Sequence, residues 1–239
     1  AMGGLLHDVG KLVQRGSGKR KNHMDVGADW LEERGNGWEA FAFAARYHHT
    51  NPNASVRLEH CTDRSLLPIA AVVAHADNLS SSEREDVEGT KNWDKNVALR
   101  NIFDQVNLEG RSKSSVPTFF PVAPLSDGHI PFPAPRGDSS ILFNYEFLEE
   151  TLKAHFNGAS SSRQAPGWVL RVLEKFTALV PSETLVAEDQ DRFPDISLFD
   201  HLRTTAMIGV CLQQCIEENH PEILESSAPY RAIESTFQK

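Results

Sequence analysis

Residues 5–11 read LLHDVGK, and the fold prediction for this chain starts from them. His7 stands directly before Asp8, with leucines ahead of the pair and Gly10 behind it. Neighbouring residues on a helix point about 100° apart, so these two side chains can share a ligand only at a crowded or terminating turn. Glycine readily adopts the left-handed conformation that ends helices, and we therefore expect Gly10 to end one here.

More imidazoles and carboxylates follow this pair at positions expected in helices. The whole set consists of His7, Asp8, His23, His48, His49, Asp77 and His201. A mixture of imidazole and carboxylate suits a borderline transition metal such as Mn, Fe, Co or Ni, whereas Mg²⁺ prefers oxygen ligands alone. The set therefore predicts a site for one or two divalent transition-metal ions.

Each member of the set also has an ordinary structural explanation. His7 can be a core histidine that a backbone group satisfies, and His201, which lies between leucines, can be a core or interface residue. The pair at 48–49 can be a helix C-terminus that favours positive charge. Asp77 can cap the polar stretch SSSERED at 80–86. The occurrence of all of them in one chain is what favours metal binding.

Composition limits the class of protein. The chain has 239 residues, 40% of them hydrophobic, which is enough for one good-sized core, or for one core plus an added subdomain. Its net charge of −9 provides no overall basic field for nucleic acid, so any such attraction must come from a local patch or a partner. We find no signal peptide and no apolar run near the roughly 20 residues of a membrane span, so we expect a cytoplasmic protein without membrane contact.

The pattern along the chain predicts a mainly α fold. Helices are expected at 26–35 (capped by Asp25), 38–49, 66–79, 145–156, 166–179 and 194–218 (capped by Asp195 or Ser197). Glycine, proline and serine become frequent between 110 and 140, which indicates short extended pieces in an insertion or linker. Cys211 and Cys215 lie four residues apart in an apolar helical stretch, so we expect them to be core thiols.

The order HD, His, His-His, Asp resembles the HD superfamily of metal-dependent phosphohydrolases. Members of that superfamily begin with a further histidine on a helix, but only six residues precede His7 here. The segment DHLRTTAMIG at 200–209 resembles the missing opening motif. The resemblance therefore implies a circularly permuted HD-domain helical bundle with a small irregular, β-containing insertion. It implies that 1–100 form the main part, 101–165 the insertion or linker, and 166–239 the returning helix (194–218) and a C-terminal linker.

A permuted HD domain points to one family. GLLHDVGKLVQR, ADNLSSSERE, LRNIFDQVNL and FPDISLFDHLRTTA resemble segments of the large, polymerase-like subunit of type III CRISPR effector complexes, most closely the type III-A (Csm) form. The resemblance implies a metal-dependent nuclease that cleaves single-stranded DNA in antiviral defence. Its partners would be other subunits of the complex and the guide RNA. No GGDD-type sequence is present, so the chain resembles an HD fragment without the palm domains.

The resemblance also suggests roles for individual residues. Asp8 would bridge two metal sites. His7, Asp77 and His201 would complete one site, and His23, His48 and His49 would hold a second ion or the scissile phosphate. His7, Asp8 and Lys11 are the expected catalytic residues, with Lys11 on a phosphate oxygen, although an ordinary surface lysine fits the same position.

Basic residues lie close to this set in the segment RGSGKRKNH at 15–23. Arg15, Lys19, Arg20 and Lys21 would hold the DNA backbone, or they form a solvated loop. Two other functions remain open for the chain: a nucleotide phosphohydrolase of HD type, and a non-catalytic module that docks neighbouring subunits.

Overall fold

A computed structural model describes residues 1–18, 20–35, 37–50, 54, 56–81, 92–106, 116–126, 131–138, 144–157, 166–187 and 192–237. The α-helices are α1 (Met2–Leu6), α2 (Val9–Ser17), α3 (His23–Glu32), α4 (Glu39–Tyr47), α5 (Leu67–Ser80), α6 (Tyr145–Asn157), α7 (Pro166–Thr177), α8 (Leu198–Asn219), α9 (Glu222–Glu225) and α10 (Pro229–Phe237). Short 3-10 helices are η1 (Leu58–His60) and η2 (Ile102–Gln105). The strands are β1 (Asn92–Trp93), β2 (Thr118–Phe119), β3 (Ala134–Pro135) and β4 (Leu185–Val186).

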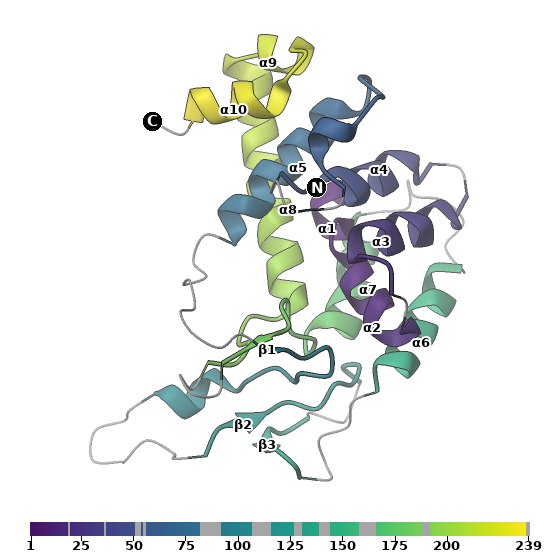
Figure 1. The fold of residues 1–239 in the computed structure, drawn as a ribbon, viewed down its shortest axis with the longest axis vertical. Coiled ribbons are helices and arrows are strands. Elements are labelled where there is room, and N and C mark those ends of the chain that lie inside the picture. Colours follow the sequence, from purple (N-terminus) through teal and green to yellow (C-terminus); the bar gives the residue numbers. More distant parts are fainter. Residues whose placement is uncertain are drawn as a thin grey trace.

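The long helix α8 joins the two ends of the chain into one bundle. Figure 1 shows the yellow-green α8 running through the molecule beside the purple N-terminal helices. The approach of α1 to α8 is close, because a Cβ added to Gly4 would lie only 2.6 Å from Cα of Ala206. Only glycine at position 4 therefore allows the segment with His7 and the segment with His201 to touch.

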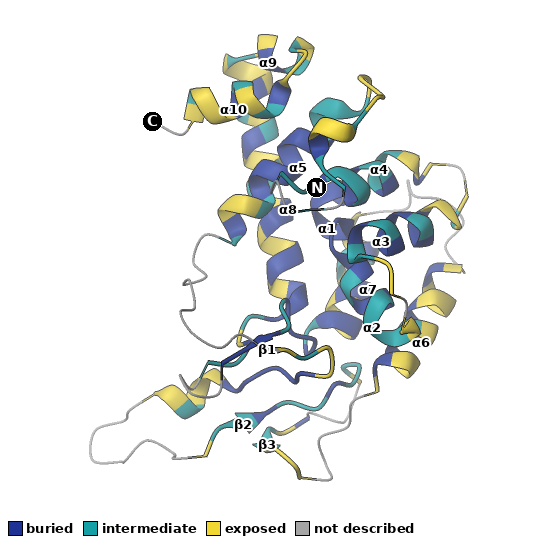
Figure 2. Cartoon of the chain, in the orientation of Figure 1, coloured by how far each residue is buried: buried dark blue, intermediate teal, exposed yellow. Residues whose placement is uncertain are grey.

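Two apolar clusters hold the helices together. The larger one joins α1, α2, α3 and α4 to α6, α7 and α8, and its fully buried members include Leu6, Leu12, Leu148 and Leu202. The smaller one joins α5 and the end of α8 to α9 and α10 through Ile216, Ile233 and their neighbours. Helix α6 thus contributes to the main core although it lies within the 101–165 range, and Figure 2 shows its inner face buried.

The strands form two small antiparallel pairs at one end of the bundle. β1 pairs with β4 in the register Asn92↔Val186, and β2 pairs with β3 in the register Thr118↔Pro135. The prediction of a mainly α fold with short extended pieces is confirmed. Among the described helices, none combines the length and the apolar character needed to cross a membrane.

Several local predictions were wrong. Gly10 does not end a helix in the left-handed conformation: it lies inside α2, and the break comes earlier, at His7 and Asp8. A Cβ on Gly10 would lie 1.9 Å from the carbonyl oxygen of His23, so glycine is needed here for the close crossing of α2 and α3. Helix α3 begins at His23, capped by Asn22 instead of Asp25.

The thiol prediction was also wrong. Cys211 is exposed and Cys215 is half-buried, because the C-terminal half of α8 is covered on one side while the face with these residues points outward. Of the two caps proposed for α8, Ser197 is the one observed, and its side chain accepts a hydrogen bond from the backbone N–H of Asp200.

Candidate metal centre

Four side chains from three separate parts of the chain meet between α1, α5 and α8. His7 and Asp8 come from the junction of α1 and α2, Asp77 from α5 and His201 from α8. Nε2 of His201 lies 3.2 Å from Oδ2 of Asp8 and 3.1 Å from Oδ1 of Asp77. Nε2 of His7 lies 3.4 Å from each of these carboxylates. We call these four residues the first cluster.

The adjacent pair His7-Asp8 can face one point because the helix is interrupted there. Helix α1 ends at Leu6, and Asp8 has φ −109° and ψ 12°, outside the helical range, before α2 starts at Val9. Both side chains are almost completely buried as a result.

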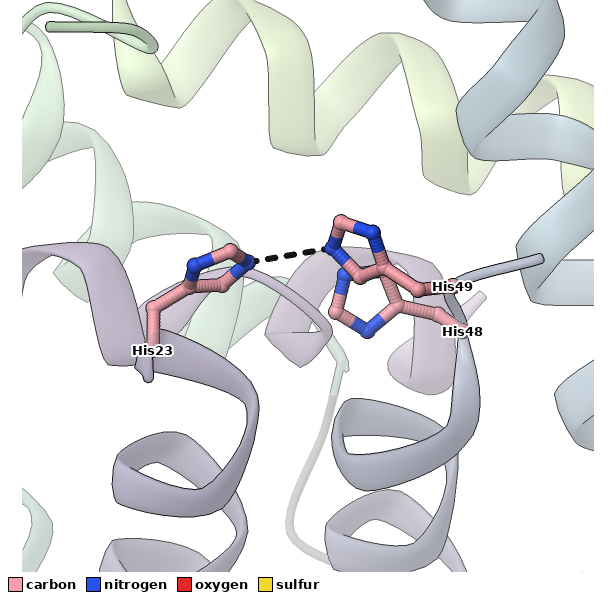
Figure 3. Close-up of side chains that lie close together, drawn as sticks. All are labelled: His23, His48 and His49. Atoms are coloured by element: carbon pink, nitrogen blue, oxygen red, sulfur yellow. Dashed lines mark hydrogen bonds between the residues drawn. The ribbon is translucent and has the colours of Figure 1, made fainter. Parts of the chain in front are cut away.

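Three histidines form a second cluster next to the first. His23 stands at the start of α3, and His48 and His49 follow the end of α4, so their rings point toward one another across the gap between the two helices (Figure 3). Nε2 of His23 and Nε2 of His49 are 3.2 Å apart. His23 keeps a partly exposed side chain, whereas that of His48 is fully buried.

Asp8 lies between the two clusters. Its Oδ2 faces His7 and His201, while its Oδ1 lies 3.2 Å from Nε2 of His23 and 3.6 Å from Nε2 of His48. One carboxylate therefore offers an oxygen to each side, which is the arrangement of a ligand that bridges two ions.

Backbone and hydroxyl groups fix the orientation of the rings. Nδ1 of His7 donates to the carbonyl of Gly4 at 2.8 Å, and Nδ1 of His48 donates to the carbonyl of Ala45 at 2.8 Å. Nδ1 of His201 lies 3.2 Å from Oγ of Ser80. Each of these contacts turns Nε2 toward the centre, as outer partners do for metal-binding histidines.

The sequence reasoning missed Ser80 and Thr205, whose hydroxyl groups lie on the side of His201 that faces away from the other ligands. The hydroxyl of Ser80 donates to the carbonyl of Asp77 at 3.0 Å and lies 2.8 Å from Oγ1 of Thr205. Both side chains are buried, and Thr205 stands one helical turn after His201. That spacing of four on α8 is the one sequence signal that could have indicated Thr205.

Charges in the first cluster are strongly coupled. Burial disfavours a charged His7, but the carboxylates of Asp8 and Asp77 outweigh burial and raise its pKa to about 10. Burial also opposes ionisation of Asp8, yet the Lys11 ammonium and His7 hold the pKa of this carboxyl well below its usual range. Without metal, the first cluster therefore keeps a protonated imidazole between two carboxylates.

The second cluster has the opposite tendency. Burial, together with the neighbouring His48, lowers the pKa of His49 to about 3. Burial also lowers the pKa of His23, even though Asp8 lies beside it. The imidazoles of His23 and His49 are therefore neutral at physiological pH, which is the form that binds a metal ion.

The donor set fits a divalent metal ion. Nε2 of His7, Nε2 of His48 and Oδ1 of Asp8 are sealed from solvent, and none forms a hydrogen bond to any described residue. The charged groups facing them lie 3.2–3.6 Å away without a hydrogen bond, and a metal ion between these atoms would satisfy all three. Imidazole nitrogens combined with carboxylate oxygens match Mn²⁺, Fe²⁺, Co²⁺ or Ni²⁺ better than Mg²⁺.

The basic residues that we expected to contact DNA have different surroundings in the structure. Arg15 lies in α2, not in a loop, and its guanidinium donates to the carbonyl of Pro181 at 2.7 Å, so it joins α2 to a distant segment. Lys21 pairs with Asp29 at 3.2 Å on the surface, and Arg20 is exposed. Lys19 lies outside the described residues. Lys11 lies 2.5 Å from Oδ2 of Asp8.

Residues 1–82 match the family described as "HD domain". Over 98% of the chain, the sequence is 28% identical to a protein of Streptococcus thermophilus named "CRISPR system single-strand-specific deoxyribonuclease Cas10/Csm1 (subtype III-A)". It is also 28% identical, over 91% of the chain, to a protein of that name from Methanocaldococcus jannaschii. The chain spans 30% and 28% of the length of these two relatives.

Solved structures give the same result. The crystal structure of Csm1 from T. onnurineus matches 89% of this chain with 28% identity and a TM-score of 0.60, and the chain covers 28% of it. A Csm1–Csm4 cassette in complex with AMPPNP matches 90% of the chain with 25% identity and a TM-score of 0.62, again over 28% of the solved chain. Residues 1–82 are therefore similar to the HD domain family, within a chain that is similar over nearly its whole length to Cas10/Csm1 proteins of subtype III-A CRISPR systems.

Proposed function

We propose that this chain is a metal-dependent phosphodiesterase that cleaves single-stranded DNA as the HD nuclease part of a type III-A CRISPR effector complex. The observation that carries the proposal is the position of Asp8, with one carboxylate oxygen facing each of two histidine-rich clusters. The names of the relatives, which are single-strand-specific deoxyribonucleases, support the substrate.

The first cluster would hold one ion, and His23, His48 and His49 would hold a second ion or the scissile phosphate. The ions would be Mn²⁺, Fe²⁺, Co²⁺ or Ni²⁺. A divalent ion at such a centre lowers the pKa of a bound water and neutralises charge on the phosphate.

The chain's own groups would bind and orient the strand. Lys11, held on Asp8 in the metal-free protein, is close enough to the centre to contact a phosphate oxygen. Arg20 and Lys21 lie three and two residues before His23, so they would contact the DNA backbone where it reaches the second cluster. Lys19 would join them. We assign Arg15 to folding instead, because its guanidinium is already engaged by backbone carbonyls.

Access to the centre favours a flexible strand. The side chains of His7, Asp8, His48 and His201 are at most 2% exposed, whereas His23 is 21% and Asp77 15% exposed. Among the described ligands, the ones with solvent-exposed surface are His23, His49 and Asp77, so the strand would approach the centre from their side. A single strand can bend its phosphate into such an opening, while the stiffer duplex cannot.

The proposal extends to partners. One solved structure similar to this chain is a Csm1–Csm4 cassette, so we propose that the full protein containing this chain binds other subunits of the effector complex and, through them, the guide RNA.

A nuclease assay on the whole chain tests the proposal. Labelled single-stranded DNA, duplex DNA and RNA would be incubated with Mn²⁺, Co²⁺, Ni²⁺ or Mg²⁺, beside a panel of free nucleotides. We expect cleavage of single-stranded DNA with the transition metals and little with Mg²⁺ alone. Equal rates on duplex DNA, or hydrolysis of nucleotides without cleavage of DNA, would refute it.

A further inference from the structure

A cavity lies beside the metal centre but outside it. Its volume is about 420 Å³, and it is bounded by the segment around η1 and by the turn between α9 and α10. The residues that matter for its chemistry are Arg57, Glu59 and Arg64 from the first segment, and Tyr230, Arg231 and Glu234 from the second. A volume of this size is typical of pockets for small ligands.

A short chain of contacts connects the cavity to the centre. Thr50, which lines the cavity, directly follows His49, and Asn78 directly follows Asp77. The Asn78 amide donates to the hydroxyl of Tyr230 at 2.9 Å and lies 3.3 Å from Oγ1 of Thr50. The wall of the cavity is therefore fixed to both clusters through adjacent residues of the backbone.

The cavity wall has more arginines than carboxylates, with Arg57, Arg64 and Arg231 against Glu59 and Glu234. Arg57 is neutralised by Glu59, with 2.6 Å between Nη1 and Oε1. Arg64 and Arg231 are exposed, and neither forms an ion pair with any residue in the described ranges. Two guanidinium groups beside an aromatic ring are suited to a nucleotide, because arginine binds phosphate in a fork and a tyrosine face accepts a base.

We propose that this cavity is a subsite that binds a nucleotide of the substrate strand next to the scissile phosphate, with Arg64 and Arg231 on backbone phosphates and Tyr230 along the base. The inference rests on the proposed function, since it identifies where the strand lies on the His49 side of the centre. Arg20 and Lys21 would hold the strand on the opposite side, where Figure 3 shows His23 facing His49.

The test measures binding and cleavage separately in the whole chain. Binding of a fluorescent oligothymidylate is followed by anisotropy in EDTA, so that no cleavage occurs. The variant is Arg64→Ala with Arg231→Ala. The matched control is Lys153→Ala with Arg171→Ala, which removes the same charge from exposed positions on α6 and α7 that do not line the cavity.

We expect the pocket variant to weaken binding about tenfold and to lower the slope of log Kd against log salt concentration by about 1.4, the value for two lost contacts to a single strand. The control should bind like wild type. Hydrolysis of bis(p-nitrophenyl) phosphate with Mn²⁺, which needs only the metal centre, should be unchanged in both variants.

Each outcome decides one of the two claims. Equal weakening in the pocket variant and the control, an unchanged salt slope, or wild-type protein that does not bind the oligonucleotide would overturn the subsite. Wild-type protein that binds through the pocket but hydrolyses neither DNA nor the small diester would overturn the proposed function and leave the subsite standing.

Discussion

Replacing Gly10 with alanine should disturb the metal centre through the backbone, without touching a ligand. The new Cβ would lie 1.9 Å from the carbonyl oxygen of His23 and 2.7 Å from the backbone nitrogen of Gly27. Ordinary contact requires about 3.5 Å, so α2 and α3 must separate by about 1.5 Å. That movement carries His23, and with it one side of the second cluster, away from Asp8.

The expected cost follows from the same geometry. Overpacking of this kind destabilises by about 1–3 kcal/mol, and alanine in a helix returns at most about 1 kcal/mol. A net loss of about 1 kcal/mol lowers the melting temperature by about 2–4 °C in a chain of this size. The Gly167→Ala variant is the control, because it also puts alanine into a helix but its Cβ meets nothing within 4 Å.

Thermal melts followed by circular dichroism, and metal analysis of the dialysed protein, give the two readouts. We expect Gly10→Ala to melt lower and to lose affinity for one ion more than for the other, while Gly167→Ala melts at or above wild type. A Gly10→Ala protein with unchanged melting temperature would show that the two helices do not cross this closely, and the reasoning would fail.

Further predictions concern the side chains. His201→Ala should lose the ion of the first cluster and the nuclease activity while its helical circular dichroism stays unchanged, and the surface variant His155→Ala should behave like wild type. Because the pKa of His7 is raised from 6.5 to about 10 against the effect of burial, folding without metal takes up a proton, so the metal-free protein should lose stability as the pH rises from 6.5 toward 10. Metal affinity should rise over the same pH window, by up to about tenfold per pH unit, because metal binding must displace the proton on His7. Calorimetry at several pH values would measure both the stability and the metal affinity. A stability or an affinity that does not change with pH would contradict these expectations. The Lys11→Met variant should keep its metal but cleave DNA about tenfold more slowly, since it loses a contact to the phosphate. Unchanged kinetics would mean that Lys11 only forms an ion pair with Asp8.

Much of the centre could be expected from the sequence, because its members are of distinctive residue types. His7, Asp8, Asp77 and His201 are brought together as expected although almost the whole chain separates the first pair from the last. Histidines at helix ends and in apolar helices indicate a metal site from the sequence alone, without knowledge of the fold. Their roles as ligands remain a prediction until metal is measured.

Other features depend on partners that are distant in the sequence. Gly10 looked like a helix stop because a glycine in one helix gives no sign of a second helix crossing it. Arg15 looked free for DNA because the carbonyl it binds lies 166 residues later. The cavity is likewise formed by two segments, around Arg64 and Arg231, that only the packing of α10 on α5 brings together.

Metal stoichiometry tests the central claim most directly. Wild-type chain, Asp8→Asn and His201→Ala would each be stripped with chelator, titrated with Mn²⁺ and analysed for bound ions per chain. If Asp8 bridges the clusters, wild type binds two ions, His201→Ala loses the one at the first cluster, and Asp8→Asn loses both. An Asp8→Asn protein that still binds as much Mn²⁺ as wild type would contradict the account.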